Sequence, residues 1–454
     1  MLKFLPTIAL AASAWLFSVA VARCADKAEP PPQPRPISGS REMLQLYGVD
    51  ESYLRKFING APLGPDEEES LWRTLFAVRR FALVDIDRWT RNDVDVKQLA
   101  ADPDKYRGEL IELSGRVKKV EIETPLEEVV DRFNLAKFYR CELAVGEEQS
   151  PATVYALAVP KAWKIGKPLD ERCAVKGLFV KLAGEDAAAA DPVLVAQRVA
   201  WYPETVLGDL KMDIGLYDEI SPRAELGARD RECFYQLLAA AGRAGTQELL
   251  RRTPGQYSAV PLFNEPEKQR GKLIALEGTA RQCLMRRVED PDIVARFGID
   301  QYYEIEMDTV DSQNNPIVFC VRDLPPGFPQ GERIFETVRI PGFYFKKWGY
   351  RVQAPPGAAD DAEQEGLVRR QLAPLLVGRQ PRWIKPEPFN SGKASTTFIG
   401  LFVVGTFVLW LIVWRLGRSD DRFHKRVVRK AIAEPEPPSL NDLGLEDAGP
   451  PRFD

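Results

Sequence analysis

Hydrophobic and polar residues recur in the same order twice along this chain. The run at 107–115, RGELIELSG, returns 163 residues later at 270–278 as RGKLIALEG. An alternating stretch follows, in which Tyr139, Cys141 and Leu143 are separated by polar residues, and its counterpart lies at 302–307. Alternation with a period of two is typical of a strand with one buried face. The pattern therefore predicts two copies of one β-rich unit.

Each copy contains a short predicted helix between its first two strands, at 126–135 and 290–299. The helix closes on Asn134 in one copy and Gly298 in the other. These are the residue types that best tolerate the left-handed conformation at a helix C-terminus. Three further strands are predicted in each copy, and the last of them precedes Trp201 or Trp383, which we interpret as core residues. Each copy thus supplies about five strands.

Gly115 and Gly278 lie inside the first predicted strand, where an isolated glycine marks a bulge or a sharp bend. Five strands with a bent first strand resemble an OB-fold, the small Greek-key barrel, over residues 105–203 and 269–386. The helix position departs from the commonest form, where it lies between the third and fourth strands. An SH3-like or other small barrel therefore stays open. The OB-fold hosts many functions, so the resemblance implies none in particular.

Two helices precede each predicted barrel, with Asp50 and Asp213 as N-cap candidates ahead of similar apolar positions. The sequence therefore predicts an α+β protein of two tandem units at 43–205 and 206–388. Each unit is expected to hold two helices and a five-stranded OB-like barrel, and one transmembrane helix follows the second unit.

Two apolar segments bracket the duplicated region. Residues 1–22 have the positive start, apolar run and small-x-small ending of a signal peptide, and a Pro-rich tether follows at 23–42. An uncleaved anchor is the alternative, and Arg23 before Cys24 disfavours a lipoprotein. The uncharged stretch at 396–414 is close to the length that spans a bilayer. The alternative for this stretch is a buried core helix.

The flanking charges predict the orientation. Seven cations lie in the 20 residues after the predicted span and four in the 20 before it. The positive-inside rule then places the N-terminal region outside and the tail at 415–454, first basic and then acidic and Pro-rich, in the cytoplasm. We expect a single-pass protein of the cell membrane that faces outward. The basic segment at 415–430 is explained as a stop-transfer cluster, with an interfacial helix on anionic lipid as the alternative.

The chemistry-bearing residues are few. The single histidine, His424, lies in the tail, and none of the six cysteines forms a Cys-x-x-Cys pair. The sequence therefore predicts no catalytic residues, no metal site and no cofactor. Buried free thiols are favoured over the bridges Cys141–Cys173 and Cys283–Cys320, because these cysteines do not match between the copies.

One pair of positions suggests a ligand face. Glu142 and Glu306 are identical outward-facing acids on the second strand, next to Phe138 and Tyr302. An aromatic ring beside a carboxylate could bind a sugar or a peptide, and an ordinary solvated strand face is the plainer interpretation. Arg132 and Arg296, matched between the copies, are better explained as structural ion pairs than as an anion site.

These observations favour a membrane-anchored extracytoplasmic binding or scaffolding protein whose partner is an envelope protein or a glycan. A carboxylate-dependent hydrolase of glycans is the first alternative. Nucleic-acid or oligosaccharide binding through the barrels is the second. Residues 23–395 hold 53 basic and 58 acidic residues, and this net charge of −5 opposes binding to nucleic acid.

Overall fold

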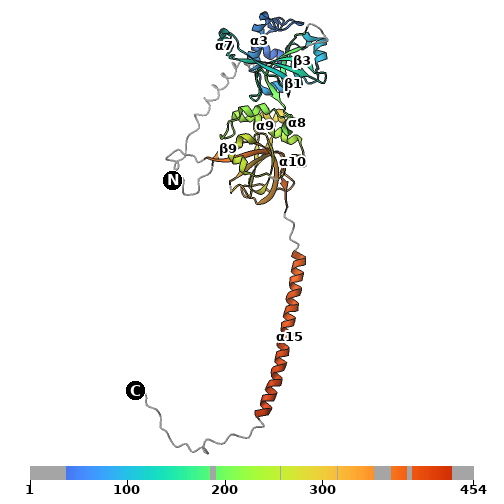
Figure 1. Ribbon diagram of the computed structural model, residues 1–454, viewed down its shortest axis with the longest axis vertical. Coiled ribbons are helices and arrows are strands. Elements are labelled where there is room, and N and C mark those ends of the chain that lie inside the picture. The colour runs from blue at the N-terminus through green and yellow to red at the C-terminus, as the bar shows by residue number, and fades with distance from the viewer. Residues whose placement is uncertain are drawn as a thin grey trace, which may run out of the picture. The chain divides into compact units, whose positions relative to one another are not determined.

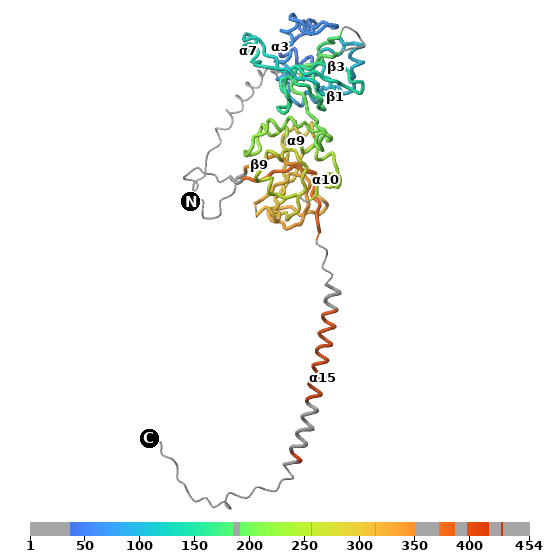
Figure 2. Tube along the Cα trace, viewed as in Figure 1, coloured from blue at the N-terminus to red at the C-terminus, as the bar shows by residue number. Residues whose placement is uncertain are grey.

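The computed structural model describes residues 37–184, 191–255, 257–313, 315–351, 370–385 and 391–431. These residues divide into a unit that ends at Lys385 and a second that begins at Pro386. Figure 1 shows the helices and strands of both units, and Figure 2 traces the chain through them. The predicted signal peptide at 1–22 and most of the tether at 23–42 lie outside the described residues.

The first half of the larger unit begins with helices and continues as a barrel. Its helices are α1 (Ser40–Leu46), α2 (Glu51–Leu54), α3 (Pro65–Val78), α4 (Leu83–Trp89), α5 (Val96–Ala101), α6 (Pro103–Tyr106) and α7 (Glu127–Phe133). Its strands are β1 (Leu110–Glu123), β2 (Phe138–Val145), β3 (Ser150–Ala158), β4 (Glu171–Leu182) and β5 (Pro192–Trp201). They form a closed barrel in the order β1-β2-β3-β5-β4.

The second half follows the same plan. Its helices are α8 (Val206–Asp209), η2 (Ile214–Glu219), α9 (Ala228–Arg243), α10 (Thr246–Arg252), α11 (Val260–Asn264), α12 (Pro266–Gln269) and α13 (Pro291–Phe297). Its strands are β6 (Leu273–Arg287), β7 (Gln301–Asp308), β8 (Ile317–Val321), β9 (Glu336–Arg351), β10 (Arg370–Gly378) and β11 (Arg382–Trp383). They form a six-stranded sheet in the order β10-β8-β7-β6-β9-β11, with a further pairing of β10 with β9.

The strand pairings correspond between the halves. β3 pairs with β5 in parallel, as β8 does with β10, and the other pairings within the barrel and their counterparts are antiparallel. The order of the first barrel is that of an OB-like Greek key, in agreement with the expected superfold. In both halves the helix lies between the first and second strands, as predicted.

The helices ahead of the first strand of each half outnumber the two that the sequence predicts there. The predicted pair corresponds to α2 and α3 in the first half and to η2 and α9 in the second. The additional helices are four to seven residues long, too short to show a clear amphipathic period. Several depend on local caps instead, as at Asp95, whose carboxylate accepts the Gln98 backbone N–H at the start of α5.

The predicted helix caps are present. Asn134 and Gly298 have φ of 49° and 62°, and both lie in the left-handed region directly after a helix. Asp50 accepts a hydrogen bond from the backbone N–H of Ser52, and Asp213 accepts one from that of Gly215. The polar residues at these helix ends therefore have the local roles expected from the sequence.

Gly115 and Gly278 do not themselves form the bulges that were expected at these positions. A Cβ on Gly115 would lie 2.1 Å from the Ala144 carbonyl oxygen, and one on Gly278 would lie 2.0 Å from that of Asp308. The register shifts fall a few residues later, at 117/119 and 280/282. Each glycine is thus required by the close approach of the neighbouring strand, and the bulge itself lies beyond it.

A buried ion pair joins helix to barrel in each half. Lys181 of β4 contacts Glu67 of α3 at 2.7 Å, and Lys346 of β9 contacts Asp230 of α9 at 2.8 Å. Both carboxylates also accept the backbone N–H of the N-cap glycine three residues earlier. The same acid therefore caps the helix and neutralises the lysine. We call these two pairs the helix clamps.

The second unit is dominated by α15 (Ser391–Ala431). Its segment Thr397–Leu416 has a mean hydropathy of 2.3 and is long and apolar enough to cross a membrane. This segment coincides with the span predicted at 396–414. The helix continues past the apolar segment into the basic residues that follow it.

Candidate functional site

The aromatic residues of the predicted ligand face lie under helices. Phe138 is 5% exposed and its ring lies 6.0 Å from that of Tyr155, in the core that α3 forms with the first barrel. Tyr302 packs edge to face on Phe234 of α9 at 5.4 Å. Burial raises the pKa of Tyr302 well above its usual range. The helices therefore cover the aromatic end of this face in both halves.

The two carboxylates lie toward the uncovered end of the same strands. Glu142 is partly exposed and forms an ion pair with Arg140 at 3.7 Å. Glu306 is half-buried, and burial followed by the nearby carboxylates of Asp308 and Glu304 raises its pKa. The structure does not bring the two positions into one site, because Glu142 belongs to the first barrel and Glu306 to the six-stranded sheet. Tyr139 and Tyr303 pack against the hydrophobic cores of these two sheets, as their strand parity predicts.

A cavity of about 320 Å³ lies where the two halves meet, and we call it the junction cavity. Its apolar lining comes from α4, the strands β3, β4 and β5, and η2, and two glutamines and a tyrosine also line it. The lining residues are Leu83, Ile86, Asp87, Glu112, Ala158, Ala174, Lys176, Gln197, Arg198, Ala200, Tyr202, Asp213, Leu216, Glu219, Glu232, Gln236 and Arg296.

Asp87 connects the halves at the edge of this cavity. Its carboxylate accepts a hydrogen bond from Lys176 at 2.6 Å and another from Arg296 of the second half at 2.6 Å. Arg296 also donates two bonds to Glu232 of α9, at 2.7 and 2.8 Å. Burial opposes the charged form of Asp87, but the bonds from the two cations outweigh it and lower its pKa.

A second charged group lies at the start of η2. Arg198 forms ion pairs with Asp213 at 3.0 Å and with Glu219 at 2.9 Å. Asp213 also accepts the backbone N–H of Trp201 and that of Gly215, both at 2.9 Å. Burial nevertheless raises the pKa of Asp213 above its ordinary value. This group fixes the last strand of the first barrel to η2 of the second half.

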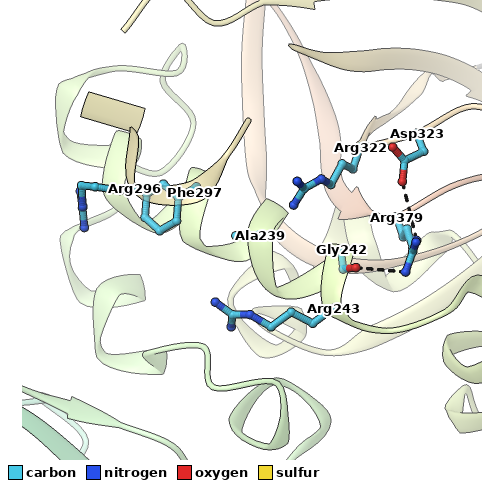
Figure 3. A pocket seen from close by; sticks show the side chains of 8 residues that line it. All are labelled: Ala239, Gly242, Arg243, Arg296, Phe297, Arg322, Asp323 and Arg379. Carbon is cyan, nitrogen blue, oxygen red and sulfur yellow. Dashed lines mark hydrogen bonds and ion pairs between the residues drawn. The ribbon is translucent and has the colours of Figure 1, made fainter. Parts of the chain in front are cut away.

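A second cavity, of about 440 Å³, belongs to the second half alone, and we call it the arginine cavity (Figure 3). It surrounds the last turn of α9 and is lined by Ala239, Gly242, Arg243, Arg296, Phe297, Arg322, Asp323 and Arg379. Arg296 is committed to Asp87 and Glu232. Figure 3 shows Arg379 directed toward Asp323 and the Gly242 carbonyl, with Arg243 and Arg322 extending elsewhere around the helix.

Sequence reasoning missed most of these groups. Arg296 was expected to form a structural ion pair, and it does, whereas Arg132 has a longer contact of 3.5 Å with Glu69. No local sequence motif marks Asp87, Arg322 or Arg379 as part of a site. A usable signal existed for the clamps: Lys181 and Lys346 directly follow the matching apolar runs GLFV at 177–180 and GFYF at 342–345.

The thiols are inert in this fold. Cys141, Cys173, Cys233, Cys283 and Cys320 are free and buried. Burial raises the pKa of Cys141 and Cys173 to about 12 and that of Cys283 to about 11. Within the residues that the structure describes, no group of three or more His, Cys, Asp or Glu could hold a metal ion. Cys24 lies outside the described residues.

Comparisons with known proteins give little beyond this. No family model matches the chain. No curated protein matches it either. Among the solved structures, one concerning the molecular basis for abrogation of activation of pro-inflammatory cytokines covers 60% of this chain and 92% of its own, at 7% identity and a TM-score of 0.14. The Ifi202 HINa domain in complex with 20-bp double-stranded DNA covers 61% and 96%, also at 7% and 0.14. Similarities at this level support no conclusion about function.

Proposed function

We propose that this chain is a single-pass, membrane-anchored binding protein whose outer region holds its ligand in the junction cavity. The observation that carries the proposal is the cavity itself, formed by residues of both halves. Its volume of about 320 Å³ lies within the range of small-ligand pockets. Such pockets favour the boundaries between domains and combine an apolar lining with a few converging polar groups.

The proposal also covers the origin of the two halves and the membrane topology of the chain. The corresponding strand pairings and the two helix clamps support an origin of both halves in one duplicated unit. The apolar segment of α15 supports an anchor in the bilayer. A cleaved signal peptide, an outward-facing region and a cytoplasmic tail complete the arrangement, and they rest on the charge pattern of the sequence.

The cavity supports binding more than hydrolysis. A carboxylate-dependent hydrolase needs an acid and a base that are available to the substrate. Five carboxylates line the cavity, and four of them, Asp87, Glu232, Asp213 and Glu219, are engaged in ion pairs with Arg296 or Arg198. The fifth, Glu112, would supply an acid or a base but not both.

Ligand binding is tested with the tagged full chain isolated from its native membranes. Small molecules and proteins that co-purify are identified by mass spectrometry. Ala200→Phe fills the junction cavity, because Ala200 is half-buried in its wall. The co-purifying set should lose at least one member in this variant and stay unchanged in the control Ala136→Phe, which is exposed and does not line the cavity. An identical set in all three proteins contradicts the proposal.

The predicted strand face is tested by a separate variant in the same experiment. Glu142→Gln together with Glu306→Gln removes both carboxylates without changing their size. Loss of a partner in this variant alone would transfer the binding function from the junction cavity to the strand face.

Membrane topology is tested with a membrane-impermeant maleimide on intact cells. In a Cys24→Ser background the five described cysteines are buried and should not react. Ser38→Cys should be labelled on intact cells, and Ser419→Cys should be labelled only after lysis. The reverse pattern contradicts the orientation, and extraction of the chain by alkaline carbonate contradicts the anchor.

A further inference from the structure

We propose that the arginine cavity of the second half is a binding site for a phosphate group. Arg243, Arg322 and Arg379 line it with a single carboxylate, that of Asp323. Arg296 contributes little charge, because Asp87 and Glu232 neutralise it. The cavity therefore carries a surplus of positive charge.

Arg243 and Arg322 are held in place by carbonyl oxygens, whereas Arg379 is also paired with Asp323. Arg243 donates to the Leu210 carbonyl oxygen at 2.6 Å, and Arg322 donates to that of Gly298 at 3.2 Å. Arg379 donates to the carbonyl oxygens of Gly242 and Ala244, both at 3.0 Å, and lies 3.7 Å from Asp323. The C-terminal end of a helix carries about half a negative charge, which the guanidinium groups of Arg243 and Arg322 exceed even after Asp323 has neutralised Arg379. A guanidinium with free N–H groups binds phosphate in a bidentate manner.

In the first half, larger side chains occupy the positions that correspond to Ala239 and Gly242 of the arginine cavity. Ala239 and Gly242 lie nine and twelve residues after the clamp acid Asp230. Phe76 and Arg79 lie at the same two positions after Glu67. In the first half Arg79 donates to the Asn134 carbonyl at the end of α7, and the large Phe76 ring packs on Phe133 at 5.7 Å.

The second half exchanges these bulky residues for small ones. Arg322, directly after β8, donates instead to the Gly298 carbonyl, which corresponds to that of Asn134. It does so across Gly242, where an added Cβ would lie 2.9 Å from its side chain. The strand position of Arg322 corresponds to Leu157 in the first half. The second half has thus replaced a packed ring with open volume and placed an additional cation at its edge.

The ligand chemistry follows from the volume and charge. A cavity of about 440 Å³ has room for more than one phosphate group, so the ligand is a molecule that carries phosphate. It is either a soluble phosphorylated compound or a phospholipid headgroup, and both present the same oxyanion to the arginines.

The test measures binding of pyrophosphate to the full chain in a non-ionic detergent by isothermal titration calorimetry. Arg243→Gln and Arg322→Gln each remove one charged donor, and each should weaken binding about tenfold, as expected for the loss of a charge-assisted hydrogen bond. Arg251→Gln is the matched control, because it removes the same charge from an exposed position of α10 outside the cavity. Ala239→Phe restores the ring of the first half without changing the charge, fills the cavity and should abolish binding.

Thermal unfolding in the absence of ligand identifies any variant that fails to fold. Arg243 is exposed, so its variant stays informative if Arg322→Gln proves unstable. Competition of pyrophosphate binding by short-chain phosphatidic acid in the same detergent, compared with glycerol 3-phosphate, distinguishes the lipid source from the soluble one. No binding of pyrophosphate by the wild type, or an equal loss in Arg251→Gln, would overturn the proposal. The result is independent of the junction cavity, because neither Arg243 nor Arg322 lines it.

Discussion

Replacing Lys181 by Met should be among the most destabilising substitutions of this chain. The ammonium group donates to both Glu67 oxygens, at 2.7 and 2.8 Å, and to the Pro62 carbonyl at 3.3 Å. Methionine has a similar volume but leaves the carboxylate, whose side chain is 6% exposed, with the backbone N–H groups of Ile58 and Gly64 as donors. Two charge-assisted bonds of about 1.5–3 kcal/mol each are lost. The sum agrees with the cost of about 3–5 kcal/mol for breaking a buried ion pair.

The assay is urea unfolding of the full chain in detergent, followed by tryptophan fluorescence. Lys97→Met is the control, because the Lys97–Glu148 pair has the same 2.7 Å separation but is exposed, so its loss should have little effect on the free energy of unfolding. The double variant Lys181→Met with Glu67→Gln removes both charges and should recover about 2 kcal/mol relative to the sum of the single changes. A cost below about 1 kcal/mol for Lys181→Met, or strict additivity in the double variant, would refute the reasoning.

Three further outcomes are expected. Gly115→Ala forces a Cβ to within 2.1 Å of the Ala144 carbonyl oxygen and should lower the free energy of unfolding by about 1–3 kcal/mol. The control Gly245→Ala has open space around it and should cost less than about 1 kcal/mol. Equal effects of the two substitutions would contradict this reasoning. In a Cys24→Ser chain a thiol reagent at pH 8 should label no cysteine before denaturation and five afterwards, because the described thiols are buried and burial raises their pKa. Fast labelling of the native protein would contradict this expectation. The lowered pKa of Asp87 stabilises the fold above the ordinary aspartate pKa of about 3.9, and this contribution is lost as the pH falls through the lower folded value. Asp87→Asn should therefore destabilise the protein at pH 7 by about 1–3 kcal/mol. The variant should also lose less stability than the wild type on acidification, which urea unfolding at pH 7 and at acidic pH would show.

Local rules account for the parts of the fold that the sequence predicts well. The caps at Asn134 and Gly298 and at Asp50 and Asp213 depend on one residue type and its immediate neighbours. Strand parity likewise placed Tyr139 and Tyr303 inside the barrels. Such features can be predicted without knowing which segment packs against them. The repeated pattern in the two copies also gave two independent instances of each prediction.

The features that escaped prediction depend on contacts between distant segments. Phe138 has the parity of an outward residue, and no local pattern indicates that α3 covers that face. Glu67 lies 114 residues from Lys181, and Asp87 lies 209 from Arg296. The arginine cavity depends as much on the small size of Ala239 and Gly242 as on its charges. Hydrophobic periodicity carries no information about a space that a missing side chain leaves open.

The helix clamps also determine how this chain divides into pieces. Each clamp places one charge on a helix and its counter-charge on a strand of the barrel, so neither part can bury its own group alone. A fragment cut between α3 and β1 would leave an unpaired lysine in one piece and an unpaired acid in the other. Helices and barrel must therefore fold as one cooperative unit in each half. A cut that leaves both clamps intact falls near Tyr202, after the last strand of the first barrel.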